Sequence, residues 1–122
     1  MLILIAGPVR SGTEGNQALI QANMQKLDAA ALQVYHKGHT PVIGEWLALP
    51  LAAAAGSREI GDEISEAYLY PVAHRLINSC DAILRMPGIS NGADNDVRVG
   101  KDLGLKIYLH MDEIPKGNNA LT

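Results

Sequence analysis

The chain has 122 residues, 48% of them hydrophobic, and its ten basic and thirteen acidic residues give a net charge of −3. This length predicts a single domain, residues 1–122, around one core. The acidic balance argues against nucleic acid or a membrane surface as a partner. The single cysteine, Cys80, excludes an internal disulfide. Because the sequence shows neither a signal peptide nor a membrane-spanning stretch, we expect a cytoplasmic protein.

The first half of the chain alternates between strand and helix patterns. An apolar run predicts a buried parallel strand at residues 2–6, and apolar residues spaced three and four apart predict a helix over 14–36. A second short strand is expected at 39–43, where Pro41 favours a strand start or an edge position. Residues 44–56 predict an apolar loop with a short helix, which forms either an oligomer contact or a pocket wall.

The second half continues the alternation. A long helix is expected over residues 57–80, kinked or divided at Pro71. The polar tail after Met111 is expected to be loose. Between them lie a strand at 81–86, a turn-rich loop at 87–92, a helix at 93–103 and a strand at 105–109. Strands that alternate with helices, without a hairpin signal, predict an α/β fold with a parallel sheet covered on both faces.

Ligands of such sheets bind beyond the carboxyl ends of the strands, where the strand order reverses. The first loop to reach that place carries Gly7-Pro8 and then Arg10-Ser11-Gly12. Backbone N–H groups at a helix start favour an anion, and glycines allow close approach. The loop lacks both the lysine of a triphosphate-binding loop and the dinucleotide fingerprint. It therefore suits a single phosphate or a sugar hydroxyl, or is simply a tight turn with a surface arginine.

The second loop precedes the helix expected at 93–103. Ser90 or Asn91 can cap that helix, and Asp94 and Asp96 fall in its first turns. These carboxylates either stabilise the helix start or point into the crevice. In the crevice, a carboxylate can attack a sugar anomeric carbon or stabilise an oxocarbenium ion.

Other polar and aromatic residues have weaker signals. Glu45 and Trp46 follow the second strand and could line the crevice, where Trp46 either stacks on a base or simply packs. Asp81 opens a strand at its amino end, far from the expected site. The pair His36 and His39 lacks an acidic or cysteine partner that would complete a metal site, so a structural or surface role is favoured. We expect no metal and no cofactor.

Together, several segments resemble the nucleoside 2-deoxyribosyltransferase superfamily, especially its small, poorly characterised bacterial and phage branch. They are residues 5–8, 38–42 and 80–88, and the motif Ser90-x-Gly92-Ala93-x-x-Asp96. The resemblance implies a flavodoxin-like (Rossmann-like) three-layer sandwich with a short parallel sheet of about four strands. It also implies a carboxylate nucleophile that cleaves the N-glycosidic bond of a 2′-deoxynucleoside and passes the sugar to another base or to water. Sites of the superfamily are often completed by a neighbouring subunit, so we expect a homo-oligomer, a dimer or larger.

The stretch from Gly7 to Gly12 is also similar to that of deoxynucleoside 5′-monophosphate N-hydrolases, which implies a nucleotide ligand. Asp96 would then be the nucleophile or an electrostatic stabiliser. The residues expected around the ligand are Gly7, Pro8, Arg10, Ser11, Gly12, Trp46, Ser90 and Gly92. Among these, Arg10, Ser11, Gly12 and Ser90 would hold the phosphate.

The chain departs from the superfamily pattern at the nucleophile, which is usually glutamate. Asp96 is one methylene shorter, a loss of reach of about 1.5 Å. A misplacement of about 1 Å can cost roughly 100-fold in rate. Arg98 replaces a small residue two positions later, where it is spaced to pair with Asp94. The alternatives to an enzyme are a non-catalytic nucleotide-binding or sensing module, and an oligomeric scaffold with a vestigial site.

Overall fold

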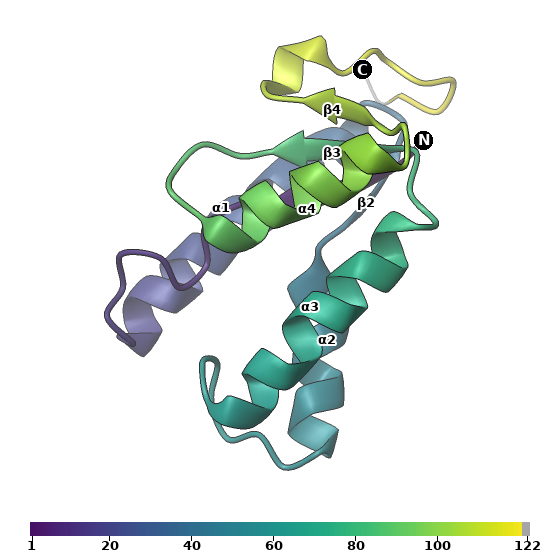
Figure 1. Cartoon of the computed structure of the whole chain (residues 1–122). Coiled ribbons are helices and arrows are strands. Elements are labelled where there is room, and N and C mark those ends of the chain that lie inside the picture. The colour runs from purple at the N-terminus through teal and green to yellow at the C-terminus, as the bar shows by residue number, and fades with distance from the viewer. Residues whose placement is uncertain (121–122) are drawn as a thin grey trace.

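The computed structural model describes residues 1–120 and has an α/β architecture (Figure 1). Its four strands form one parallel sheet in the order β2-β1-β3-β4. The strands are β1 (Leu2–Ala6), β2 (Thr40–Val42), β3 (Ala82–Arg85) and β4 (Lys106–Tyr108). The helices are α1 (Gln17–His36), α2 (Gly44–Ala54), α3 (Glu63–Ile77) and α4 (Asn91–Asp102), followed by a 3-10 helix at Met111–Glu113. The predicted α/β fold is confirmed, and the layers are those of a flavodoxin-like sandwich.

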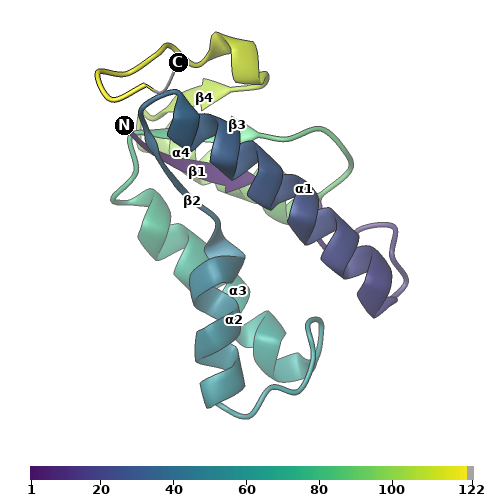
Figure 2. The same ribbon diagram turned by 180° about the vertical axis from the view of Figure 1, so that it is seen from behind.

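β1 lies inside the sheet, between β2 and β3, and this position explains its continuous apolar sequence. Successive side chains of a strand point to opposite faces. Ile3 and Ile5 therefore join the core beneath α1, whereas Leu4 and Ala6 join the core beneath α4. Helix α1 covers one face of the sheet (Figure 2), and α4 covers the other (Figure 1). The apolar stripe predicted for α1 is buried against this core.

The segment after β2 forms a regular helix, α2, where an apolar loop with a short helix was expected. Ala48 and Ala52 are fully buried, while Trp46, Leu47 and Leu51 remain exposed. Such small side chains let α2 lie directly along α3 as a helical pair beside the sheet (Figures 1 and 2). Although α2 is apolar on all sides, no helix within residues 1–120 has both the length and the apolarity that crossing a bilayer requires.

The expected division of the next helix at Pro71 is wrong, because α3 continues through it. Proline removes one backbone donor and leaves the carbonyl of residue 67 without its helical partner. Both Ala67 and Pro71 are exposed, so water can satisfy that carbonyl. The helix also begins later than expected, since the Asp62 carboxylate caps it by accepting a 2.8 Å hydrogen bond from the Ser65 N–H.

The described part of the tail, residues 112–120, is held on the protein through Ile114 and Pro115, contrary to the expectation that the tail is loose; residues 121–122 lie outside the described residues. Ile114 is only 2% exposed. The Lys37 ammonium donates to the carbonyl oxygens of Met111 and Ile114 at 2.9 and 3.0 Å. His39 Nε2 lies 2.6 Å from the carbonyl oxygen of Pro115, which is the structural role favoured for this histidine. A single buried isoleucine among polar residues produces no periodic pattern, so the sequence did not predict that Ile114 packs into the core.

The order of the strands reverses at β1, which predicts a crevice at the carboxyl ends of the strands. The chain passes from β1 to β2 on one side, then crosses to β3 on the other side of β1. In this type of fold, ligands bind between β1 and β3, outside the carboxyl ends of the strands. The loop after β1, the start of α2 and the start of α4 all meet there.

Candidate functional site

A cavity of about 370 Å³ lies at this edge of the sheet. The end of β1 and the loop after it form its floor and one side, and the first turns of α2 and α4 form others. A face of α3 completes the wall with Leu69, Tyr70 and Ala73. Pockets that enclose small ligands commonly measure roughly 300–1,000 Å³, so the cavity can hold a small molecule.

Most of the residues expected around a ligand line this cavity. They are Gly7, Arg10, Ser11, Ser90, Gly92 and Asp96. Gly7 is needed for packing, because a Cβ there would lie 2.8 Å from Leu27 Cδ2 and 2.9 Å from Met86 Cβ. Ser90 is buried and caps α4, since its hydroxyl oxygen accepts a hydrogen bond from the Ala93 N–H at 3.1 Å.

Three other expected site residues lie outside the cavity lining: Pro8, Gly12 and Trp46. Pro8 packs on the loop after β3, where a Cβ at Gly88 would lie 2.7 Å from Pro8 Cγ. Gly12 is exposed and has a φ of +74°, so it serves the turn. The indole N–H of Trp46 donates to Asp28 Oδ1 on α1 at 2.9 Å, so the ring packs at the surface between two helices.

The site includes Glu45, which precedes Trp46 in the first turn of α2. Glu45 lines the cavity, and burial raises the pKa of its carboxyl group. Adjacent residues of a helix point about 100° apart, which explains why Glu45 faces inward and Trp46 outward. The sequence predicted that either residue could line the crevice. Which of them does so depends on how α2 is rotated about its axis, and the sequence does not show this rotation.

Asp96 lies in the second turn of α4, with its side chain partly buried in the cavity. Burial is the main cause that raises its pKa, to about 7, and the nearby charge of Glu45 adds to this effect. The positive charge of Arg85 acts in the opposite direction. At neutral pH this carboxyl group is therefore close to half protonated, which is typical of groups that exchange protons in active sites.

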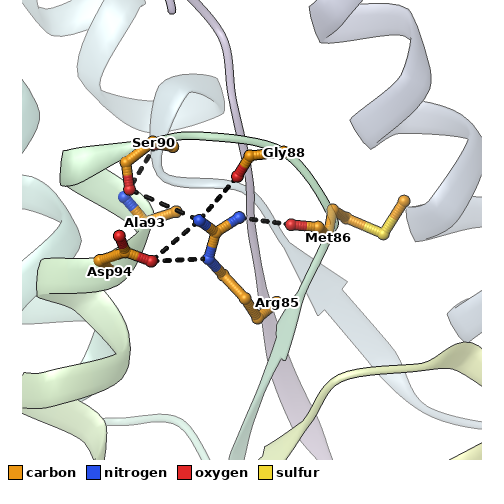
Figure 3. A network of polar contacts seen from close by, with 6 residues as sticks. All are labelled: Arg85, Met86, Gly88, Ser90, Ala93 and Asp94. Atoms are coloured by element: carbon orange, nitrogen blue, oxygen red, sulfur yellow. Dashed lines mark hydrogen bonds and ion pairs between the residues drawn. The ribbon is translucent and has the colours of Figure 1, made fainter.

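Arg85 organises the loop that leads into α4 (Figure 3). Its side chain is only 13% exposed and donates two hydrogen bonds to Asp94 Oδ1, at 2.9 and 3.3 Å. It also donates to the carbonyl oxygens of Met86, Gly88 and Ser90. One guanidinium group thus ties the end of β3, the turn after it and the first turn of α4 together. The sequence did not predict this role, because an arginine at the end of a strand has no pattern that identifies its partners.

The pairing considered between Arg98 and Asp94 does not occur. Asp94 pairs with Arg85, and Arg98 donates to the side-chain oxygen of Asn95 instead.

Replacement of Arg85 by methionine tests the loop network. We expect the free energy of unfolding to fall by about 1–3 kcal/mol, because partly buried carbonyl oxygens and the Asp94 carboxylate lose their donor. Urea unfolding measures this change. Arg98→Met is the matched control, as Arg98 is exposed and bonds only to the neighbouring turn. Equal losses for the two variants would show that Arg85 does not organise the loop.

The charges in the cavity differ from those expected of a phosphate cradle. Arg10 already forms an ion pair with Glu66 of α3. The lining holds three carboxyl groups, those of Glu45, Glu66 and Asp96, against the single guanidinium group of Arg10. The start of α1 is capped by Asn16, whose side-chain oxygen accepts from the Leu19 N–H at 3.1 Å. A phosphate would therefore have to compete for Arg10.

Two acidic or nucleophilic groups lie away from the cavity. Asp81 accepts a 2.7 Å hydrogen bond from the Leu2 N–H at the amino edge of the sheet, as its place in the sequence predicted. Cys80 is buried beneath α4, and burial raises the pKa of its thiol to about 11. A thiol that stays protonated at neutral pH is a poor nucleophile, which leaves Cys80 as a core residue.

No family model, curated protein or solved structure matches this chain. The resemblance of its motifs to the deoxyribosyltransferase superfamily therefore stays a prediction, and the function has to be inferred from the cavity.

Proposed function

We propose that this chain binds a 2′-deoxynucleoside, or its 5′-monophosphate, and cleaves the N-glycosidic bond as an N-glycosidase or deoxyribosyltransferase. The observation that carries the proposal is the placement of Asp96, partly buried in a cavity at the carboxyl edge of a parallel sheet. The resemblance of the loops to the superfamily supports the same nucleophile position.

The chemistry requires a carboxylate beside the anomeric carbon. Glycosidic bonds break through a transition state that resembles an oxocarbenium ion, and a carboxylate stabilises this positive charge or bonds to it covalently. The acidic lining favours a developing positive charge, because fixed charges act more strongly in a site shielded from water. Water or a second base then releases the sugar from Asp96.

The same charges favour the neutral nucleoside over the monophosphate. The ion pair between Arg10 and Glu66 neutralises the only cation of the lining, and a phosphate would face the acidic side chains of Asp96 and Glu45, which carry negative charge whenever they are ionised. Like charges that meet in a binding site typically cost several kcal/mol. We expect the unphosphorylated deoxynucleoside to be the better substrate.

The test is to incubate the protein with the four common 2′-deoxynucleosides, and separately with their 5′-monophosphates, and to measure free base by chromatography. We expect release from at least one deoxynucleoside, and slower release from its monophosphate. Ribonucleosides serve as the control for the sugar. If no substrate yields free base but a deoxynucleoside raises the unfolding temperature, the chain is a binding or sensing module and not an enzyme.

A further inference from the structure

Glu45 is the second carboxyl group that faces the reaction volume. It follows the carboxyl end of β2, whereas Asp96 follows that of β3, and β1 lies between these two strands. The two side chains therefore approach the same cavity from opposite sides of the β1 end. A small molecule bound in the cavity can therefore meet both residues.

The surroundings of Glu45 fix its direction. Ile43 precedes α2, is fully buried and offers no side-chain cap. The Glu45 carboxyl group accepts a hydrogen bond from its own backbone N–H at this open helix start. Gly44 packs against α3, where a Cβ on it would lie 3.6 Å from Ala73 Cβ. Glu45 is thus held at the cavity wall by the start of α2.

The surroundings of the two carboxyl groups are unequal. Burial is the largest cause that raises the pKa of Glu45, and its own N–H is the cause that lowers it. Asp96 additionally experiences the positive charge of Arg85. The other charged groups that face the cavity, Arg10 and Glu66, are paired with each other. Arg85 therefore favours the ionised form of Asp96, whereas burial favours the protonated form of Glu45.

We propose that Glu45 is the general acid that protonates the leaving base while Asp96 attacks the anomeric carbon. This assignment rests on the proposed function. Two carboxyl groups that reach one cavity from different strand ends match the pair that glycoside cleavage uses, one as acid and one as nucleophile.

The steps balance without any further reactant except water. In the first step a bond forms between Asp96 and C1′, and the bond from C1′ to the base nitrogen breaks. The bond's electron pair stays with the base, which takes the Glu45 proton. In the second step water forms a bond to C1′, the ester bond to Asp96 breaks, and Glu45 takes the proton from water. Both carboxyl groups return to their starting states.

The experiment compares two substrates that differ in their need for a proton. 2′-Deoxyguanosine requires protonation of its base, whereas the base of N7-methyl-2′-deoxyguanosine is already cationic and leaves as a neutral molecule. For Glu45→Gln we expect kcat/KM on deoxyguanosine to fall by roughly 10²–10⁴-fold, with little change on the methylated substrate. Spontaneous release from the methylated substrate is subtracted with a sample that lacks protein.

The controls separate this inference from the function itself. Glutamine at position 45 can still accept the hydrogen bond at the helix start, so the fold should be kept. Glu63→Gln, at an exposed position of α3, is the matched control and should behave as the wild type on both substrates. Asp96→Asn should lose activity on both substrates.

Two results for Glu45→Gln would overturn the assignment and leave the proposed function intact: equal losses on the two substrates, or no loss on either. Wild-type protein that releases only the methylated base would likewise show that no general acid is present. Wild-type protein that releases no base from the methylated substrate or from any of the four common deoxynucleosides would refute the proposed function and the role of Glu45 with it.

Discussion

Replacing Asp96 with asparagine is expected to lower base release by on the order of 10⁴-fold or more. The amide keeps the size of the side chain but can neither form the ester with C1′ nor carry the negative charge that stabilises the transition state. Rates of base release from a deoxynucleoside under saturating conditions measure the loss. Asp102→Asn, at the exposed end of α4, is the matched control and should retain activity.

The covalent step has its own readout. Rapid acid quenching of the wild-type reaction, followed by peptide mass analysis, should detect a deoxyribosyl group on the peptide that contains Asp96. If Asp96→Asn retains more than a small part of the wild-type rate, Asp96 is not the nucleophile. A rate loss without any trapped ester would instead leave Asp96 as an electrostatic stabiliser of the oxocarbenium ion.

The stability of the protein is expected to fall as the pH rises from about 4 to above 7. The pKa of Asp96 is raised from 3.8 to about 7 in the folded state. The folded protein therefore binds this proton more strongly than the unfolded chain does, and stability is lost while the proton dissociates. A shift of this size corresponds to up to about 4 kcal/mol above pH 7.

Urea unfolding of the wild type and of Asp96→Asn at several pH values tests this expectation. The variant should become progressively more stable than the wild type between pH 4.5 and 7.5, because it has no carboxylate to bury. Asp62 has the opposite effect on the pH dependence of stability. Its helix-cap hydrogen bonds lower its pKa, so the stability that it contributes is lost only in acid. A difference between variant and wild type that does not change with pH would show that Asp96 does not titrate as described.

The sequence predicted the parts of the fold that repeat a simple pattern. β1 is an unbroken aliphatic run, and α1 carries an apolar stripe over its length, so both were recognisable. Helix α2 has no such stripe, because apolar residues occupy both its buried and its exposed sides. Its helical form depends on the contact of Ala48 and Ala52 with α3, which a local pattern does not contain.

The candidate site was predicted at the level of loops rather than side chains. The loops after β1, β2 and β3 do meet, because parallel strands present their carboxyl ends at one edge. The selection of Glu45 over Trp46 depended on the rotation of α2. The partners of Arg10 and Arg85 could not be predicted, because folding alone brings them together. Arg10 pairs with Glu66, and Arg85 donates to carbonyl oxygens of the turn after β3.

The ion pair between Arg10 and Glu66 also has a consequence for the kinetics of ligand exchange. The ion pair fastens the loop after β1 to α3, and a 3.2 Å hydrogen bond from Gln17 Nε2 to the Ile60 carbonyl oxygen fastens the start of α1 to the segment before α3. Both side chains of the ion pair are about a third to two fifths exposed, so dissolved ions screen their attraction. We therefore expect the rate at which a neutral ligand enters and leaves to increase with ionic strength, the reverse of the behaviour of sites that attract their ligands by charge.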